Sequence, residues 1–514
     1  MVLAKYDIRG IQNFIYRTAK LRDAVGASYI VEHCIDDALA DACQKEGLSL
    51  NAKWFDENGA IKYSEKNDNT VDAQVLYVGG GNAYVSFADK EMAYRINKRM
   101  AKYVMENTYS LQLAAAVVPQ TDNYAKDFQK LNEEMIRVKD EMIASKPVGA
   151  FPLDKVERKT GYPVAVSSDK ALSLESILKS KAEEEARRHV KKYEKLLDEY
   201  VDEKGRDSML AVVHIDGNNM GLRIRSLIQG ITNYDDAINQ MREISYAINN
   251  SYKKVFAEMQ NHFQPESGKD LNLMKVLVAG DDVTFVCRAK IALSAVEYFS
   301  RAISEYTITG KGDSTGNMHF SVCAGVAYFN SHYPFNVAYE VAEACCSKAK
   351  DRAKKPENMD CGLIGNWVDF QLCRNVQALD LDKVREREYV TASGEKLLRR
   401  PYFIKVKAFE NKFQNLNGDR QVSFDEFKGI MKEYVQEKDN IPRSYVKDLR
   451  NAYSMGEEQV IMLRAFLESR DKKLPKEMYD LDEKGVKTAV LYDALEMADY
   501  YEDFDGNGKE ENAQ

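Results

Sequence analysis

The 514-residue sequence predicts an α+β fold with two ferredoxin-like domains followed by a helical C-terminal domain. Three observations support this prediction. At roughly 150 residues per domain, the chain is long enough for three or four units. The same β-α-β-β-α-β order of apolar patterns occurs twice, and the pattern becomes mainly helical near the end.

The first copy occupies residues 1–146. Its predicted strands and helices alternate in the order given above over residues 3–8, 12–46, 74–78, 83–87, 89–107 and 111–118. The long helical pattern is interrupted at Gly26-Ala27-Ser28. The two central strands flank Gly79-Gly80-Gly81-Asn82, a turn sequence that predicts a hairpin.

The second copy occupies residues 206–358 and repeats this order. Its predicted elements lie at residues 209–215, 221–259, 273–279, 283–287, 290–306 and 319–328, with an amphipathic helix at 337–354. Gly280, Asp281 and Asp282 take the place of the first hairpin turn.

The remaining segments differ in composition from both copies. Residues 147–205 form a connector, in which a Pro- and Gly-rich stretch precedes a helix dense in Glu and Lys. Residues 359–500 begin with mixed elements and continue with helical patterns over 424–435, 443–453 and 457–468. Residues 501–514 have the composition of an acidic, frayed tail.

Composition limits the classes of function. The net charge of -8 argues against indiscriminate coating of nucleic acid, which requires clustered Lys and Arg. The eight cysteines lack C-x-x-C spacing, so neither a zinc ribbon nor a disulfide framework is expected. Without an N-terminal export pattern or an apolar run of roughly 20 residues, we expect a cytoplasmic protein with no membrane association.

The first chemical motif follows the apolar strand that begins the second copy. This strand includes Ile215, ends at Asp216 and turns into a helix through Gly217-Asn218-Asn219-Met220-Gly221. A carboxylate at a strand end beside free backbone amides is an arrangement that suits phosphates and their counterions.

The second motif is the hairpin turn Gly280-Asp281-Asp282. Adjacent carboxylates at a tight turn repel each other, so a cation, a donor or solvent must compensate their charge. The first strand and this hairpin are neighbours in a ferredoxin-like sheet, which would bring Asp216 close to the pair. We therefore predict a Mg²⁺ or Mn²⁺ site formed by Asp216, Ile215, Asp281 and Asp282.

Simpler explanations exist for each motif alone. An Asp-Gly-Asn turn after a strand is common, and an isolated Gly-Asp-Asp hairpin is more often a solvated turn than a metal site. The occurrence of both motifs in this element order, each beside an apolar strand, favours the metal site.

Three other patterns are weaker. Residues 415–427 resemble a calcium loop but carry Arg420 where the sharp turn requires glycine, and a similar start at 503–508 lacks the final Glu. No G-x-x-x-x-G-K-[ST] phosphate loop occurs. His214 could face the same side of its strand as Asp216 and act as a base, although a structural histidine is the more common case.

Together, these residues resemble one known family, the large polymerase-like subunit of type III CRISPR effector complexes, which is related to GGDEF-type nucleotide cyclases. The similarity covers most of the chain. Besides the motifs above, it includes Gly10-Ile11-Gln12-Asn13-Phe14-Ile15, Leu21-Arg22-Asp23, residues 321–327, Pro334 and Ala349-Lys350. In this family the two ferredoxin-like units are polymerase-type palm domains.

The resemblance implies synthesis of cyclic oligonucleotide messengers, usually from ATP, between two palms that each hold a nucleotide. Asp216, Asp281 and Asp282 would be catalytic and would bind metal. Lys350 would neutralise phosphate charge, unless it is an ordinary solvated helix lysine. Nucleotide would also contact Gly280, the turn that includes Gly217, Asn218, Asn219, Met220 and Gly221, and the first-palm turn of Gly79, Gly80, Gly81 and Asn82. Because Gly81 and Asn82 replace the acidic pair, the first palm would bind nucleotide without activating it.

The sequence departs from the family pattern in three places. No His-Asp dipeptide occurs and the chain starts at the first palm, so we expect no N-terminal nuclease domain. The connector lacks the cysteines that often bind zinc in relatives, so no zinc is expected. Ala279 replaces the first glycine of the usual Gly-Gly-Asp-Asp, which would alter substrate fit without removing a metal ligand.

Three functions are compatible with these features. The leading one is a metal-dependent nucleotidyltransferase or cyclase that makes cyclic nucleotide messengers in antiviral signalling. Another is an idle scaffold that binds guide RNA or CRISPR effector subunits, and a third is transfer of AMP to a different small acceptor. Whether the chain acts inside a CRISPR complex, alone or as a homodimer is left open by the sequence.

Overall fold

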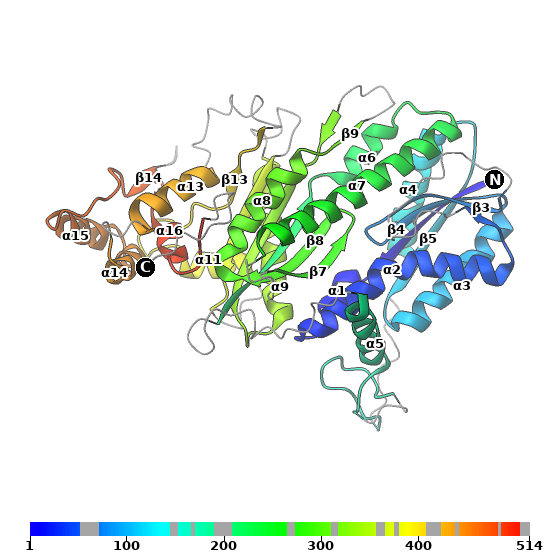
Figure 1. Ribbon diagram of the computed structural model, residues 1–514, viewed down its shortest axis with the longest axis horizontal. Helices are drawn as coiled ribbons and strands as arrows, with labels where there is room; N and C mark the ends of the chain where they lie inside the picture. The colour runs from blue at the N-terminus through cyan, green and yellow to red at the C-terminus, as the bar shows by residue number, and fades with distance from the viewer. Residues whose placement is uncertain are drawn as a thin grey trace.

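A computed structural model describes residues 1–51, 71–143, 153–165, 170–189, 208–264, 273–309, 317–355, 365–374, 380–407, 423–436, 441–481 and 485–503. Figure 1 shows two α/β units side by side and a smaller, mainly helical unit at the end remote from the N-terminus. Among the described residues, no helix is long and apolar enough to cross a membrane. The predicted α+β fold class with two ferredoxin-like units and a helical C-terminal part is confirmed.

The first palm is built on a five-stranded sheet in the order β2-β3-β4-β1-β5. Its strands are β1 (Val2–Arg9), β2 (Leu50–Asn51), β3 (Ala73–Gly79), β4 (Asn82–Phe87) and β5 (Gln112–Pro119). Its helices are α1 (Ile11–Tyr16), α2 (Leu21–Glu46), α3 (Lys90–Thr108) and α4 (Tyr124–Glu141). Apart from the short edge strand β2, this is the ferredoxin-like strand order.

The second palm repeats this arrangement on a six-stranded sheet in the order β13-β12-β11-β6-β8-β7. Its strands are β6 (Met209–Gly217), β7 (Leu273–Ala279), β8 (Asp282–Arg288), β11 (Val322–Asn330), β12 (Asn366–Leu372) and β13 (Tyr402–Ile404). Its helices are α6 (Met220–Ile228), α7 (Tyr234–His262), α8 (Ala292–Ser304) and α9 (Phe335–Ala353), with a short turn η2 (Ala289–Ile291) and a small ladder of β9 (Thr307–Thr309) and β10 (Asn317–His319).

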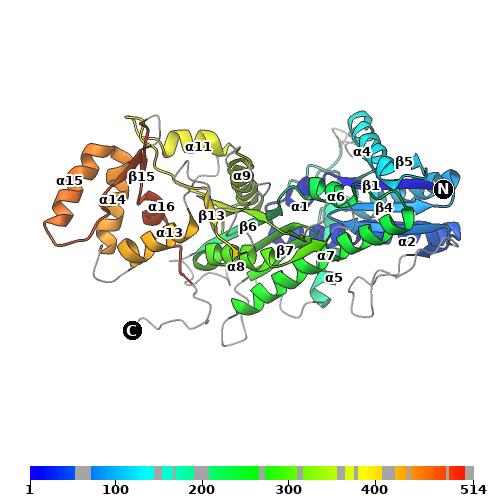
Figure 2. The same ribbon diagram turned by 90° about the horizontal axis from the view of Figure 1, so that it is seen from above.

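Each palm packs one of its helices against a strand of the other palm. Helix α2 of the first palm packs against β7 of the second, and α7 of the second palm packs against β3 of the first. The Asn249 amide on α7 donates to the backbone carbonyl of Val78 at 2.9 Å, and Lys253 pairs with Glu32 on α2 at 2.9 Å. The two units are therefore joined by reciprocal contacts, in which each palm supplies a helix that packs on the sheet of the other. Figure 2 shows the two units next to each other, with the C-terminal unit beyond the second palm.

Two features of the first palm differ from the sequence prediction. The expected interruption at Gly26-Ala27-Ser28 is wrong, because α2 is continuous and the break lies between Tyr16 and Leu21. Gly26 allows close packing instead, since a Cβ atom there would collide with the carbonyl oxygen of Lys179 on α5 (Leu174–His189). Helix α4, which the prediction omitted, is the counterpart of α9 in the second palm.

The connector reaches back to the first palm through α5 (Leu174–His189), which packs along α2. Lys179 and Glu175 form a buried ion pair at 2.7 Å, and the Lys179 ammonium also donates to the backbone carbonyl of Phe14 on α1. Arg17 contacts both Glu175 and Tyr162. These contacts fix the C-terminal end of α1 in place.

The C-terminal unit follows β12 and has its own apolar core. Its elements are α11 (Leu381–Glu388), α13 (Phe424–Ile430), the π-helix η4 (Met431–Gln436), α14 (Arg443–Met455), α15 (Glu457–Glu468), β14 (Tyr479–Leu481), β15 (Lys487–Ala489) and α16 (Tyr492–Met497). Arg400 is fully buried and pairs with Asp493 and Glu496, each at 2.9 Å, which ties this unit to the strand region of the second palm.

The second palm's sheet extends beyond residue 358, where the sequence placed its end, because β12 and β13 add to the edge formed by β11. Most of the candidate calcium loop at 415–427 and of the loop at 503–508 lies outside the described residues.

Candidate active site

The predicted acidic residues meet where two neighbouring strands of the second palm end. Asp216 on β6 stands opposite Asp282 on β8 in the antiparallel register, so their Cα atoms are roughly 5 Å apart. Asp281 lies at the hairpin tip, and its backbone carbonyl accepts a 3.2 Å hydrogen bond from the amide of Gly217. The sequence motifs therefore lie together in space, as their order along the chain predicted.

Glycine at position 217 leaves room for the Asp281 carboxyl group. A Cβ atom at this position would lie 2.8 Å from both Cβ and Oδ2 of Asp281 and 2.9 Å from the Tyr252 hydroxyl. Any side chain here would push the Asp281 carboxylate away from Asp216. This close approach explains why the strand carrying Asp216 ends in glycine.

The hairpin tips of the two palms touch. Gly280 has φ +64°, and a Cβ atom on it would lie 3.2 Å from the amide nitrogen of Gly80 at the tip of the first-palm hairpin. Both the backbone conformation and the contact therefore favour glycine at position 280. The acidic pair is thus next to the first palm.

Two charged side chains of α9 face this cluster. The Lys350 ammonium pairs with the Asp216 carboxylate at 2.5 Å, and although burial opposes its charge, Asp216 raises the pKa of Lys350. Glu343 lies two helical turns earlier, where burial raises its pKa, Asp216 adds to the rise and the Gln12 amide opposes it. Sequence reasoning missed Glu343, although its helical spacing from Lys350 places both on one face.

His214 lies beneath the acidic pair. Its Nδ1 atom is 3.4 Å from Oδ1 of Asp282 and 3.3 Å from the hydroxyl of Thr284. Burial lowers the pKa of His214 to about 4, against the opposing effect of Asp216. The imidazole is therefore neutral at pH 7 and compensates none of the carboxylate charge.

The acidic pair is electrostatically strained without a cation. Burial raises the pKa of Asp281 to about 7, and the Asp216 carboxylate adds to the rise. Burial also raises the pKa of Asp282 well above its usual range, helped by Asp216 and then by Asp281. Oδ1 of Asp282 is buried and has no hydrogen-bond partner. These oxygens fit a hard divalent cation, which would relieve both the repulsion and the missing partner.

Within the described ranges, no group of three or more His, Cys, Asp or Glu side chains already has metal-binding geometry. The ammonium of Lys350 sits on Asp216 instead. A cation bound through Oδ2 of Asp216 would compete with Lys350 for that oxygen.

The predicted phosphate turn after Asp216 is only partly open. The Asn218 side chain points inward and donates to the backbone carbonyl of Gly365 at 3.0 Å, and Met220 is buried in the core. Ile215 is also fully buried, so only its backbone can face a ligand. Asn219 has φ 53° at the start of α6, and nothing lies within 4 Å of the position that a Cβ atom on Gly221 would take.

In the first palm, Gly79, Gly80, Gly81 and Asn82 form the equivalent hairpin tip. Asn82 pairs with Asp7 on β1 as Asp282 pairs with Asp216, so Gly81 corresponds to Asp281. Asp7 also pairs with Lys139 at 2.6 Å. Sequence comparison of the two copies missed this second Asp–Lys pair because the helix that carries Lys139 was not predicted.

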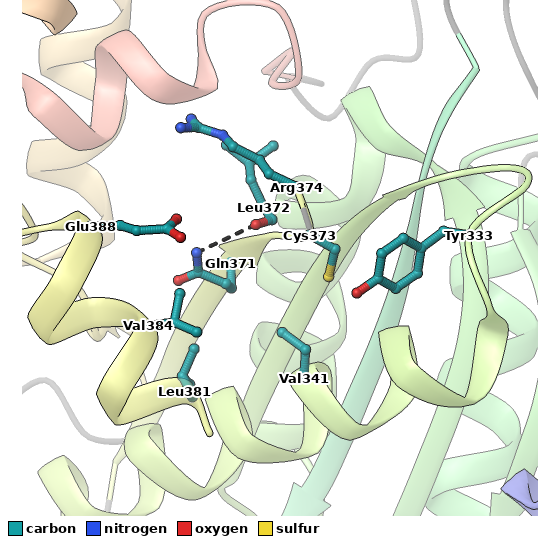
Figure 3. A pocket seen from close by; sticks show the side chains of 9 residues that line it. All are labelled: Tyr333, Val341, Gln371, Leu372, Cys373, Arg374, Leu381, Val384 and Glu388. Atoms are coloured by element: carbon teal, nitrogen blue, oxygen red, sulfur yellow. Dashed lines mark hydrogen bonds between the residues drawn. The ribbon is translucent and has the colours of Figure 1, made fainter. Parts of the chain in front are cut away.

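A small, largely apolar pocket lies elsewhere, between β12, α9 and α11 (Figure 3). Val341, Leu381 and Val384 face Cys373 across it, and the Gln371 amide donates to the Leu372 carbonyl at 3.4 Å. It includes none of the acidic residues of the site and is not the predicted nucleotide site.

Comparison with known proteins supports the resemblance. Residues 209–358 match the family model described as Cas10/Cmr2, second palm domain. None of the curated proteins compared with the chain matches it in sequence. The chain is therefore similar to this family over its second palm, where Asp216, Asp281 and Asp282 lie.

Solved structures show the same fold over nearly the whole chain. The structure of Csm1 in T. onnurineus matches 97% of this chain and 69% of its own, with 14% identity and a TM-score of 0.58. A Csm1-Csm4 cassette in complex with one ATP matches at 13% identity and a TM-score of 0.57, and one in complex with cA4 at 13% and 0.56, each with the same coverage. The chain therefore shares the two-palm fold of Csm1, a protein whose complex with Csm4 is described as part of the type III-A CRISPR-Csm interference complex.

Proposed function

We propose that this chain is a divalent-metal-dependent nucleotidyltransferase that makes cyclic oligonucleotide messengers from ATP as a type III CRISPR effector subunit. The supporting observation is the meeting of Asp216, Asp281 and Asp282 at adjacent strand ends, next to the hairpin tip of a second palm. The match of residues 209–358 to the Cas10/Cmr2 second palm supports the same proposal.

The chemistry is transfer of a nucleotidyl group. A ribose hydroxyl of one ATP would attack the α-phosphate of another, forming a phosphodiester and releasing pyrophosphate. Mg²⁺ or Mn²⁺ would be held by the carboxylates of Asp216, Asp281 and Asp282, with the Ile215 backbone nearby, and would lower the pKa of the hydroxyl and neutralise the leaving group. Lys350 would exchange Asp216 for a phosphate oxygen when the cation binds.

Other residues would orient the nucleotides. Gly280, the start of α6 at Asn219 and Gly221, and the first-palm tip formed by Gly80 and Gly81 would allow close approach of phosphates. Gly217, Asn218 and Met220 would act by shaping this turn, since Asn218 and Met220 are buried. The first palm would hold its nucleotide without activating it.

The test is direct. The purified chain is incubated with each nucleoside triphosphate and Mg²⁺ or Mn²⁺, with and without RNA, and the products are identified by mass spectrometry. We expect cyclic adenylates from the wild type and none from Asp281→Asn/Asp282→Asn. The exposed adjacent pair on α7 gives a matched control, Asp235→Asn/Asp236→Asn, which should retain wild-type product. Absence of nucleotide product under every condition would refute the proposal.

An idle scaffold is the competing function, and the charge imbalance around Asp281 and Asp282 argues against it. A carboxylate pair whose pKa values are raised in this way is stabilised either by taking up protons or by binding a cation, and such raised values are typical of functional sites. The scaffold would be favoured by co-purification of defined guide RNA together with wild-type behaviour of the Asp281→Asn/Asp282→Asn variant.

Association with other effector subunits belongs to the same proposal, since solved relatives of this fold are Csm1-Csm4 cassettes. Co-expression with such a subunit, followed by size-exclusion chromatography with light scattering, would separate a hetero-complex from a homodimer.

A further inference from the structure

Helix α1 of the first palm reaches the acidic site of the second palm. The ring of Tyr16 stacks on that of Tyr339 of α9 with the planes 15° apart, and Phe335 donates its backbone amide to the Ala19 carbonyl at 3.4 Å. The Tyr339 ring in turn meets His214 edge to face, with centroids 5.5 Å apart. His214 contacts Asp282 directly. A continuous line of packed side chains therefore joins α1 to the carboxylate pair.

A second contact from α1 arrives one helical turn away. The Gln12 amide interacts with the carboxylate of Glu343, which lies near Asp216 on the same face of α9 as Lys350. Gln12 and Tyr16 are four residues apart and so face the same side of their helix, as do Tyr339 and Glu343 on α9. One face of α1 therefore packs against one face of α9.

Helix α1 is not free to move independently. Its Ile11 side chain fills the space beside Gly81, where a Cβ atom would collide with it, and Lys179 of the connector helix holds the Phe14 carbonyl. The Tyr16 side chain is buried, whereas Gln12 is exposed. The six residues of α1 therefore lie between the connector, the first-palm hairpin and α9 of the second palm.

We propose that Tyr16 and Gln12 are positioning residues that complete the metal site of the second palm from the first palm. This rests on the proposed function. Tyr16 holds the ring of Tyr339, which fixes His214 under Asp282, and Gln12 holds Glu343 beside Asp216. The acidic cluster is then presented to a divalent cation only while the first palm is docked.

The test measures Mn²⁺ binding to the nucleotide-free protein by electron paramagnetic resonance. We expect Tyr16→Leu to weaken binding about tenfold and Gln12→Ala about threefold, while Tyr16→Phe, which keeps the stack, stays within about twofold of wild type. Gln12→Ala removes an exposed side chain and leaves no cavity, so it reports on position even if Tyr16→Leu fails to fold. The exposed Tyr94 provides the control variant Tyr94→Leu, which should bind as wild type does.

The product assay gives a second reading. The Mn²⁺ concentration for half-maximal rate should shift by the same factors, while KM for ATP changes less than about twofold. If Asp281→Asn/Asp282→Asn binds Mn²⁺ as tightly as the wild type, the metal site itself is wrong, and the positioning role falls with it. If that variant loses Mn²⁺ but Tyr16→Leu and Gln12→Ala do not, only the positioning role is refuted.

Discussion

The two palms share one fold but differ in the charge of the side chains around their hairpin tips. Each has an Asp at the end of its first strand, Asp7 or Asp216, paired with a lysine at the same position along the last helix, Lys139 or Lys350. Around this shared pair, the other positions differ. Gly81 and Asn82 stand where the second palm has Asp281 and Asp282, and Lys5 and Asn132 stand where it has His214 and Glu343.

This difference gives two copies of one fold different electrostatics at equivalent positions. The second palm concentrates carboxylates, and a bound cation would relieve their mutual repulsion. The first palm has a positive charge of its own at the equivalent position, which is the Lys5 ammonium. This group donates to Asn132 at 2.8 Å and lies over the Tyr84 ring. Helix α6 of the second palm also brings Arg225 near Tyr84, in the place where α1 brings Tyr16 to the second palm. The first palm can attract phosphates without a metal.

The largest effect should come from replacing the acidic pair of the second tip with the residues at the same positions in the first. Asp281→Gly/Asp282→Asn gives the Gly-Gly-Asn turn that already folds at residues 80–82, so the backbone should be retained. We expect product formation to fall by about 1,000-fold or more, since the groups that would hold the cation are lost. The rate is measured with saturating ATP and Mn²⁺, and folding is checked by circular dichroism. Retention of more than about a tenth of the activity would contradict the division between the palms.

A smaller loss is expected from the contact between the tips. Gly280→Ala introduces a side chain at φ +64° and 3.2 Å from Gly80, which should displace the adjacent acidic pair and lower the rate by about 10- to 100-fold. Gly80→Ala is the matched variant, since it has a similar φ of +58° but its nearest neighbour is 3.9 Å away. Both should lose about 1 kcal/mol of stability from backbone strain. An equal loss of rate in the two variants would show that strain, not the contact, matters.

The lysines test the charge difference through stability. Lys350→Met leaves Asp216 among uncompensated carboxylates, so we expect a loss of about 2 kcal/mol in metal-free buffer. Lys139→Met removes an equivalent pair beside Lys5 and should cost under about 1 kcal/mol. The midpoint of urea unfolding with chelator measures both. Added Mn²⁺ should restore Lys350→Met but not Lys139→Met, and equal responses would refute the asymmetry.

The sequence was sufficient to predict the scaffold and the acidic cluster because both depend on local patterns. An apolar strand ending at Asp216 and a Gly-Asp-Asp turn between two strands are visible in single segments, and strand order then brings them together. The resemblance added Lys350. The omission of α4 was avoidable, since its buried residues Tyr124, Phe128, Leu131 and Met135 follow helical spacing.

Other parts of the site could not be read from one segment. Tyr16 and Gln12 contact Tyr339 and Glu343 across the interface between the palms, and no periodicity in α1 indicates what lies opposite. Gly26 is a related case, because glycine in a helical pattern predicts a break, whereas the packing that requires it involves Lys179, which is distant in the sequence. Contacts between distant segments depend on how whole units dock, which local propensity does not encode.

The smallest predicted effect is a difference in the sign of pH dependence. The folded-state pKa of Asp281 is raised by burial to about 7, from an ordinary value near 4, so the folded protein binds the extra proton and its stability falls as pH rises between these values. Burial lowers the pKa of Lys5 from about 10.5 to about 8, so in the first palm stability rises over that higher range.

Each contribution should be about 1 kcal/mol, because both groups are partly exposed. Urea unfolding without divalent ions at pH 5, 7, 8.5 and 10 measures them as differences from Asp281→Asn and Lys5→Met. From pH 5 to 7, the free energy of unfolding of Asp281→Asn should rise relative to that of the wild type. From pH 8.5 to 10, the free energy of unfolding of Lys5→Met should fall relative to that of the wild type. Saturating Mn²⁺ should abolish only the first difference, because a cation bound by the second palm compensates ionised Asp281, whereas Lys5 lies in the palm that supplies its own positive charge.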